Sequence, residues 1–245
     1  KDQFLIKRYD IICLQETHCS SMNINTFEKE WPGASTWNKG SNNSKGVAIL
    51  LGPHCDFSIL KIDMDFNNRI VAIVLKIGND KINLINIYGP NTETREENEY
   101  FFETISTYID PSLPTILAGD FNMIENVNLD RDGGNKREHH TWGLQALTDL
   151  KREFSLNDAW REKNPKKTIF TWQSYHGRIQ SRLDRFYISN DLSPLIKSID
   201  VDPCSWSDHD YLHMVFLLPN DTQRGPGYWK LNSSILADQD YKDEI

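Results

Sequence analysis

The chain has 245 residues, 38% of them hydrophobic, and this length and composition suit one large domain with a substantial core. The formal net charge of -8 argues against a uniformly basic nucleic-acid-binding protein. No apolar run approaches the roughly 18 residues of a membrane span, and no basic-then-apolar leader opens the chain, so we expect an intracellular protein with no membrane partner.

The positive charge is concentrated in one segment. Residues 131–185 contain twelve Lys and Arg against seven Asp and Glu, a local charge of +5, so the remainder of the chain carries -13. A basic segment inside an acidic chain favours one face that meets a polyanion. Solvated charges scattered over several faces would give the same count.

The four cysteines, at positions 13, 19, 55 and 204, share no metal-ligand spacing. Cys13 lies between apolar neighbours, in Ile12-Cys13-Leu14. The sequence therefore predicts reduced, structural thiols.

Hydrophobic periodicity predicts the elements along the chain. Apolar runs predict strands, in chain order, at 11–14, 47–51, 57–62, 70–77, 81–88, 168–175, 181–188 and 209–218. Residues 78–80, Gly-Asn-Asp, suit the turn of a hairpin between the fourth and fifth of these strands. Helical spacing predicts helices at 94–109, opened by a Thr94 cap with Glu97 three residues on, and at 142–154.

Three other segments complete the organisation. Residues 3–9 resemble the tail of an amphipathic helix, and the polar residues 123–141 predict a long loop beside the active site. Residues 219–227 are rich in Asn, Asp, Gly and Pro, which places the end of one domain at residue 219 and makes 220–245 a linker and the start of a further segment. Continuous apolar strands together with hairpins predict an α/β sandwich rather than a doubly wound sheet.

Polar side chains follow several of the apolar strands. An apolar strand beginning at Ile116 leads into Asp120 and Asn122, which would face the same way if the strand continued. Three other segments of the chain likewise lead to a polar residue, at Glu16, Tyr88 and His209. We therefore expect four polar clusters to converge on one end of a sheet.

The ordered set of motifs resembles the exonuclease-endonuclease-phosphatase superfamily, which includes DNase I, exonuclease III and the apurinic endonucleases. The resemblance spans roughly residues 5–218. The motifs are, in order, Gln15-Glu16-Thr17, Asn86-Ile87-Tyr88-Gly89-Pro90-Asn91, Gly119-Asp120-Phe121-Asn122, Ser181-Arg182-Leu183-Asp184 and Ser207-Asp208-His209. Within the superfamily the chain is similar to the endonuclease domain of a LINE-type (non-LTR) retrotransposon, and residues 225–232 resemble the segment that leads from that domain toward reverse transcriptase.

The resemblance implies a fold, the DNase I-like four-layered α/β sandwich of two packed mixed β-sheets flanked by helices. The chain departs from the family pattern at one place: a strand with a catalytic asparagine precedes the helix of residues 3–9 in the family, and nothing before Gln15 supplies it. This departure calls into question the independent activity and full stability of the 245-residue piece.

The chemistry of phosphodiester hydrolysis requires a hard cation, an oriented water and donors for developing negative charge. Glu16 at a strand end is the best Mg²⁺ ligand, since Mg²⁺ prefers one or two carboxylates plus water and phosphate, and Mn²⁺ takes the same oxygen ligands. His209 can donate to a phosphate oxygen near neutral pH.

The resemblance implies further roles. Asp184 orients His209, Asp120 orients or deprotonates the attacking water, and Asn122 and Tyr88 hydrogen-bond the scissile phosphate. Asp208 is a secondary candidate for binding the metal or positioning the water. Each residue also has an ordinary structural interpretation, such as a turn aspartate, a half-buried strand tyrosine or a buried histidine.

Specificity must come from elsewhere, because the same catalytic set serves nucleases, lipid phosphatases and deadenylases. The loop at 174–180 joins two predicted strands and corresponds to a hairpin that reaches a DNA groove in the retrotransposon endonucleases. We therefore expect Tyr175, Arg178 and Gln180 to probe minor-groove width and step flexibility. A solvated hairpin tip is the alternative, and Thr171 and Ser181 match hydroxyl positions that contact DNA in the family.

Three functions remain in competition. The leading one is a Mg²⁺-dependent endonuclease that nicks one strand of double-stranded DNA and leaves a 3′-hydroxyl for target-primed reverse transcription. It implies a nuclear location and a longer polyprotein with reverse transcriptase. The others are a phosphatase or phosphodiesterase acting on lipid or nucleotide substrates, and a catalytically inactive DNA- or protein-binding module.

Overall fold

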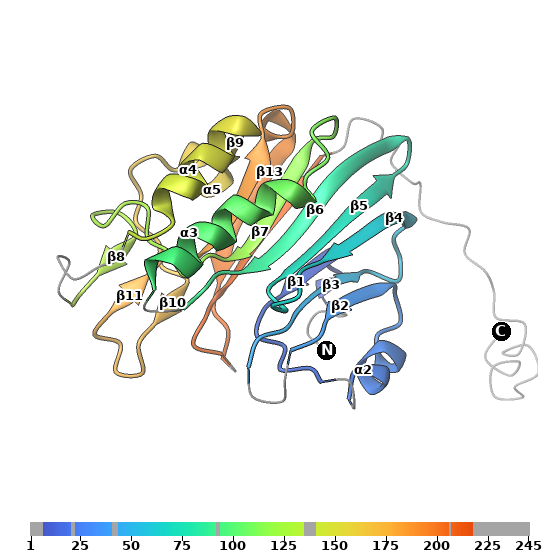
Figure 1. The fold of residues 1–245 in the computed structure, drawn as a ribbon, viewed down its shortest axis with the longest axis horizontal. Coiled ribbons are helices and arrows are strands. Elements are labelled where there is room, and N and C mark those ends of the chain that lie inside the picture. The colour runs from blue at the N-terminus through green and yellow to red at the C-terminus, as the bar shows by residue number, and fades with distance from the viewer. Residues whose placement is uncertain are drawn as a thin grey trace, which may run out of the picture.

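The computed structural model describes residues 7–20, 23–40, 44–91, 94–134, 141–205 and 207–217. A mixed six-stranded sheet forms the centre of these residues (Figure 1), and only its β6–β7 pair is parallel. The strands lie in the order β4 (Phe57–Met64), β5 (Ile70–Ile77), β6 (Asp80–Tyr88), β7 (Thr115–Asp120), β12 (Asp184–Ser189) and β9 (Leu156–Asp158).

A second layer of strands packs on one face of this sheet and consists of two antiparallel parts. One part has the order β1 (Ile11–Leu14), β3 (Val47–Leu51), β2 (Ser35–Asn38), and the other pairs β13 (Ile196–Asp202) with β14 (Tyr211–Phe216). All five residues of β3 are buried because alternate side chains face opposite ways. Val47, Ile49 and Leu51 join the core shared with the central sheet, whereas Ala48 and Leu50 pack on the other side with Trp31.

Helices cover the outer faces of both strand layers. Helix α3 (Arg95–Thr104), the 3-10 turn η1 (Ile105–Tyr108) and α4 (Leu144–Glu153) bury Phe102 and Leu147 against the central sheet, and Figure 1 shows α3 and α4 crossing that face together. Helix α2 (Ile24–Glu30) lies beside the small sheet, where the rings of Phe27 and Trp37 stack at 6.0 Å between centroids. Helix α5 (Ala159–Lys163) buries Trp160 in the core between the two strand layers. The result is the four-layered α/β sandwich that the sequence predicts.

Several predicted elements differ in their extent. The predicted helix 94–109 divides into α3 and η1, and the Thr94 side chain makes no capping hydrogen bond, so the expected capping box is wrong. Helix α4 is two residues shorter at its start and one shorter at its end than predicted, and β4 extends two residues beyond the predicted 57–62. Sequence periodicity did not predict α2, β2, β9, α5 or β13.

The region 168–188 departs most from the prediction. In place of two long strands it contains β10 (Trp172–Gln173) and β11 (Gln180–Ser181), followed by β12. Between β11 and β12 the Arg182 backbone N–H donates to the Asp130 carbonyl at 2.8 Å. The segment expected to be a loop at 123–141 contributes the short strand β8 (Arg131–Asp132), which pairs with β11.

Two predictions lie mostly or wholly outside the described residues: the helix tail at 3–9, and the domain end, linker and reverse-transcriptase-like segment from 219 onward. Among the helices that the structure describes, none combines the length and the apolar character needed to cross a bilayer.

Candidate active site

Three neighbouring strands place three of the predicted residues in one row. In the parallel β6–β7 pair Tyr88 lies opposite Asp120, and in the antiparallel β7–β12 pair Asp120 lies opposite Asp184. Adjacent strands are about 4.8 Å apart, so these groups belong to one cluster at the edge of the sheet. Gly119 permits the close approach of β6 and β7, because a Cβ at this position would lie 2.0 Å from the Ile87 carbonyl oxygen.

Asp120 is the buried centre of this row, with 4% of its surface exposed. Burial and the nearby charge of Asp184 raise the pKa of Asp120 to about 7, although the positive charge of His209 opposes them. A carboxyl group with this pKa exchanges protons near neutral pH, as a general base must.

A turn after β7 places Asn122 beside Asp120. Strand β7 ends at Asp120, and Asn122 has a positive φ of 47°, so the continuing strand that would align the two side chains is not formed. Instead, the Asn122 backbone N–H donates to Asp120 Oδ1 at 2.8 Å, and the Asn122 side-chain amide donates to the Gly89 carbonyl at 3.0 Å. The turn therefore keeps both residues at the strand end.

His209 is held by Asp184. The imidazole Nδ1 lies 2.9 Å from Asp184 Oδ2, and the His209 side chain is 28% exposed. Burial lowers the pKa of His209, but the hydrogen bond and charge of Asp184, with the charges of Asp120 and Asp208, outweigh it and raise the pKa to about 9. The ring is therefore protonated at neutral pH, and Nε2 can donate to an anionic oxygen.

Glu16 completes the cluster from the second layer of strands. It follows β1 with a positive φ of 48°, and the Tyr88 hydroxyl donates to Glu16 Oε1. Burial and this hydrogen bond raise the pKa of Tyr88, which keeps the phenol neutral and able to donate. Glu16 Oε2 lies 3.6 Å from His18 Nε2, a histidine that sequence reasoning left without a role.

Two further residues hold the cluster together, and sequence reasoning missed both. Asn86 is fully buried, and its amide donates to the carbonyls of Leu14 and Ala48 at 2.9 Å each, which ties the central sheet to β1 and β3. Arg69 donates to the Gly89 carbonyl at 2.9 Å and lies 4.8 Å from the centroid of the Tyr88 ring. A polar residue inside an apolar run was the available signal for Asn86.

Asp208 faces a neighbouring hairpin. Its Oδ2 accepts a hydrogen bond from the indole of Trp172 at 2.9 Å, and its backbone carbonyl accepts one from the Gln173 N–H at 3.2 Å. Asp208 is adjacent to His209 in the sequence, but one of its carboxylate oxygens faces β10.

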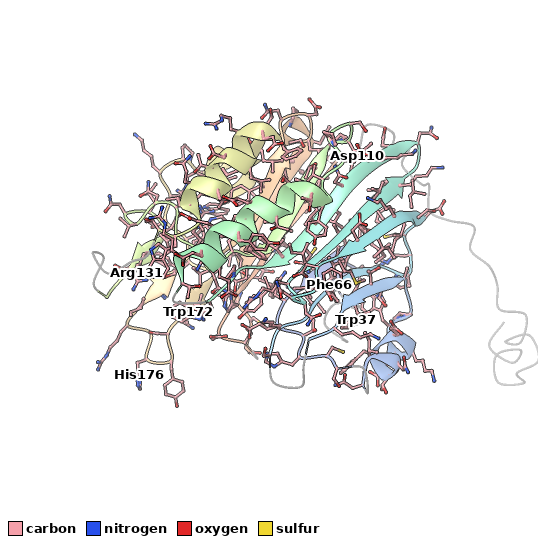
Figure 2. All side chains as sticks on the ribbon, viewed as in Figure 1. Trp37, Phe66, Asp110, Arg131, Trp172 and His176 are labelled. Atoms are coloured by element: carbon pink, nitrogen blue, oxygen red, sulfur yellow. The ribbon has the colours of Figure 1, made fainter. Side chains whose placement is uncertain are left out.

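The hairpin between β10 and β11 projects from the body of the protein, and Figure 2 shows His176 at its tip. The side chain of Tyr175 is fully open to solvent at 96% exposure, Arg178 is exposed, and Gln180 is half-buried. Thr171 and Ser181, in contrast, are 1% and 2% exposed, and this burial argues against a direct contact of either hydroxyl with DNA. Thr171 Oγ1 instead accepts hydrogen bonds from the backbone of Leu183 and Asp184.

The basic segment 131–185 is only partly available at the surface. Arg182 and Arg185 are buried, and both lie near Asp130, which is itself buried. Arg182 donates to Asp130 Oδ1 at 2.9 Å and lies 2.7 Å from Asp158, whereas Arg161 donates to Asp130 at 2.6 Å. These arginines fix the backbone on either side of Asp184, so they do not add to an exposed positive face.

The carboxylates fit a divalent cation. Asp120 is buried among the acidic groups Asp184 and Glu16, which both disfavour its ionised form. A bound cation would offset this repulsion, and the Glu16 side chain, 51% exposed, is open to receive one. Glu16 is the residue that could hold such an ion beside Asp120.

Comparisons with known proteins agree with this geometry. Residues 5–209 match the family model described as the endonuclease/exonuclease/phosphatase family. The chain is also 30% identical over 242 residues to a Xenopus laevis protein named transposon TX1 uncharacterized 149 kDa protein. This match covers 97% of the chain but 18% of the relative's length.

Solved structures confirm the fold. An AP endonuclease from Archaeoglobus fulgidus aligns with a TM-score of 0.69 at 21% identity, over 89% of this chain and 92% of that one. A 3′ phosphatase from Neisseria, bound to product DNA hairpin, aligns with a TM-score of 0.68 at 19% identity, over 89% and 93% of the two chains.

Proposed function

The chain belongs to the endonuclease/exonuclease/phosphatase family, and from this membership and the site geometry we propose that it is a Mg²⁺-dependent endonuclease that nicks one strand of double-stranded DNA. The observation that carries the proposal is the His209–Asp184 pair beside the buried Asp120 at one sheet edge. A protonated donor next to a carboxyl group with a pKa near 7 suits hydrolysis of a phosphate ester.

Each residue has a role in this proposal. Asp120 accepts a proton from the attacking water as its oxygen bonds to phosphorus. The bond from phosphorus to the 3′-oxygen breaks, the phosphate stays on the 5′ side with the attacking oxygen, and the 3′-alkoxide takes a proton from solvent water to leave as a 3′-hydroxyl. The imidazolium of His209, held by Asp184, donates to a nonbridging phosphate oxygen and stabilises the charge of the pentavalent transition state.

Glu16 would hold the divalent cation, with Asp208 as a further candidate, and Asp120 would stay free to act as the base. The cation neutralises phosphate oxygens when bound. Tyr88 and Asn122 supply neutral donors, and the raised pKa of Tyr88 preserves its hydroxyl proton. Mn²⁺ would replace Mg²⁺, because both accept oxygen ligands.

The proposed substrate is DNA. The Neisseria structure is named for its bound DNA hairpin, and the projecting hairpin with Tyr175 and Arg178 offers an aromatic ring and a guanidinium to a groove. Similarity to a transposon protein supports the further proposal that the nick primes reverse transcription by another part of a longer polyprotein, in the nucleus.

A supercoiled-plasmid assay tests the proposal. Wild-type protein with Mg²⁺ should convert supercoiled DNA to the open circle, and Asp120→Asn should reduce the rate by several orders of magnitude. Asp149→Asn, an exposed carboxylate on α4, is the matched control and should nick normally. Chelation by EDTA should stop the reaction, and added Mg²⁺ should restore it.

Other outcomes favour the competing functions. Intact plasmid together with turnover of small phosphate esters would support a phosphatase or phosphodiesterase. Salt-dependent retention of DNA without cleavage at any Mg²⁺ concentration would support an inactive binding module. Either result would refute the endonuclease proposal.

A further inference from the structure

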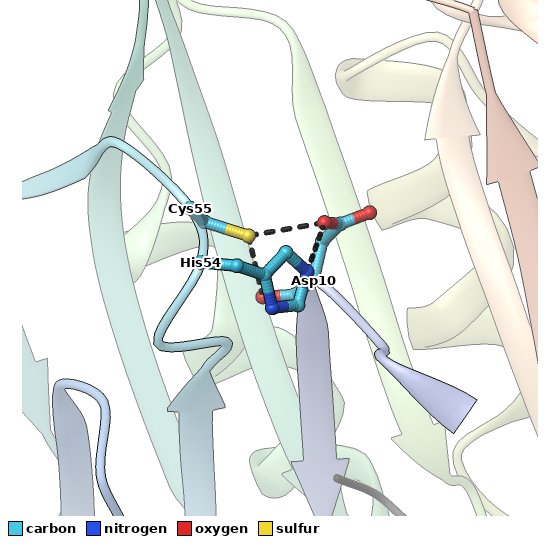
Figure 3. A group of neighbouring side chains, drawn as sticks. All are labelled: Asp10, His54 and Cys55. Atoms are coloured by element: carbon cyan, nitrogen blue, oxygen red, sulfur yellow. Dashed lines mark hydrogen bonds and ion pairs between the residues drawn. The ribbon is translucent and has the colours of Figure 1, made fainter. Parts of the chain in front are cut away.

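A second cluster of potential metal ligands lies away from the active site. It consists of Asp10, His54 and Cys55, and we call it the Asp-His-Cys cluster (Figure 3). Strands β1 and β3 pair with Ile11 opposite Leu51. The residue before β1 therefore meets the residues after β3, although they are more than 40 positions apart in the sequence.

The three side chains point at one another. Asp10 Oδ1 lies 3.0 Å from both His54 Nε2 and Cys55 Sγ, and all three ligand atoms fall within 4.8 Å of one another. Ligands around a tetrahedral Zn²⁺ are separated by roughly 3.3–3.8 Å, as bond lengths of about 2.0–2.3 Å require. Shifts of the side-chain ligand atoms by roughly a few tenths of an ångström would therefore accommodate an ion.

The backbone preorganises the cluster. The Gly52 N–H donates to the Asp10 carbonyl at 2.8 Å, and the Cys55 N–H donates to the Gly52 carbonyl at 3.1 Å. Gly52 also makes room for the histidine, because a Cβ at this position would lie 2.8 Å from His54 Cε1. The cluster remains accessible, since the side chains of Asp10 and His54 are 67% and 29% exposed.

The cluster is separate from the nuclease site. Asp10 and Glu16 lie at opposite ends of β1, and its four residues alone span roughly 13 Å at about 3.3 Å per residue. The donor types also differ. The active site offers carboxylate and amide oxygens, which suit Mg²⁺, whereas one sulfur, one imidazole nitrogen and one oxygen suit a softer ion.

The geometry points to a second metal site, in which Asp10, His54 and Cys55 bind Zn²⁺ or a similar borderline divalent cation. On binding, the Cys55 thiol gives its proton to solvent and a metal-thiolate bond forms, with no change of oxidation state. Water takes the fourth position of the tetrahedron. In this proposal Cys55, which is flanked by His54 and Asp56, has a role beyond the structural one predicted for the four cysteines.

Cobalt titration tests the site, because Co²⁺ adopts the same tetrahedral geometry and gives absorption from thiolate ligands. Reduced, metal-free protein should bind one equivalent of Co²⁺ with a thiolate-to-cobalt band, and Zn²⁺ should displace it. Cys55→Ser should abolish the band, and His54→Ala should weaken binding by at least about 100-fold, since even outer partners of a metal contribute 10–100-fold. Cys204→Ser, a half-buried cysteine elsewhere, should keep the band.

Three measurements complete the test. Zn²⁺ should raise the Tm of wild-type protein but not of Cys55→Ser, because the ion joins β1 to the segment after β3. Circular dichroism should show that Cys55→Ser and His54→Ala both fold. Both variants should also nick DNA as the wild type does. A band that persists in Cys55→Ser, or equal displacement of Co²⁺ by Mg²⁺, would overturn the assignment.

Discussion

Replacing Asp184 with asparagine should change the protonation of His209 with little change in shape. The hydrogen bond between His209 Nδ1 and Asp184 Oδ2 can persist with an amide oxygen, but the negative charge is lost. The rise in the pKa of His209 from 6.5 to about 9 corresponds to about 3 kcal/mol in favour of the imidazolium. The hydrogen bond and charge of Asp184 are the largest contributions that raise this pKa, whereas Asp120 and Asp208 add less and burial lowers it, so the variant should titrate well below the wild type.

This change has a measurable effect on catalysis. At pH 7.5 a histidine with a pKa of 9 is about 97% protonated, whereas one with a pKa of 6.5 is about 10% protonated. The Asp184→Asn variant should therefore nick DNA up to about tenfold more slowly at pH 7.5, and its rate should recover partly as the pH falls toward 6.

The assay is an NMR titration of His209 in metal-free wild-type and Asp184→Asn protein, combined with nicking rates between pH 5.5 and 9.5. Asp208→Asn is the matched control and should lower the pKa less, because Asp208 acts on His209 through its charge alone and hydrogen-bonds Trp172. A pKa that stays above 8 in Asp184→Asn would refute the electrostatic reasoning.

The same pair predicts a pH dependence of stability. The folded pKa of His209 lies above its unfolded value, so the contribution of the pair is complete below about pH 6.5 and is lost as the pH rises through about 9. In urea unfolding, the difference between wild type and Asp184→Asn should be up to about 3 kcal/mol at pH 6 and should shrink toward zero by pH 10. A difference that does not change with pH would indicate a packing effect instead.

Three further variants test other parts of the structure. Asp120→Asn should be inactive, yet its free energy of unfolding in urea at pH 8 should exceed that of the wild type by up to about 4 kcal/mol. The reason is that the pKa of the wild-type carboxyl rises from 3.8 to about 7 on folding, so the wild-type protein loses stability as the pH rises through 7. Asp130→Ala should lower the free energy of unfolding by about 3–5 kcal/mol, because it leaves Arg182 buried with one partner fewer. Arg178→Ala should weaken DNA binding and reduce its salt slope by about 1, whereas Lys76→Ala, on β5, should not.

The sequence predicted the strands best where burial is continuous. Residues 47–51 and 70–77 form strands with the predicted bounds, because all their side chains except the exposed Lys76 are apolar and nearly all of these are buried. The region 168–188 could not be predicted in the same way. Its short strands are fixed by Thr171 Oγ1 and by the Asp130 carbonyl, both distant in sequence, and no periodicity encodes such contacts.

The site shows the same division between local and distant information. The motifs supplied the residue types, and strand register then brought Tyr88, Asp120 and Asp184 into one row without any local signal for their spacing. The sequence misled for the buried arginines. The basic segment 131–185 favoured an exposed positive face, but Arg182 and Arg185 lie in the interior. A guanidinium can be buried only with partners that compensate its charge, and Asp130 and Asp158 supply them from separate segments. The buried arginines that need this compensation, Arg182 and Arg185, flank Asp184, so the interior charge network and the orientation of His209 depend on the same short length of backbone.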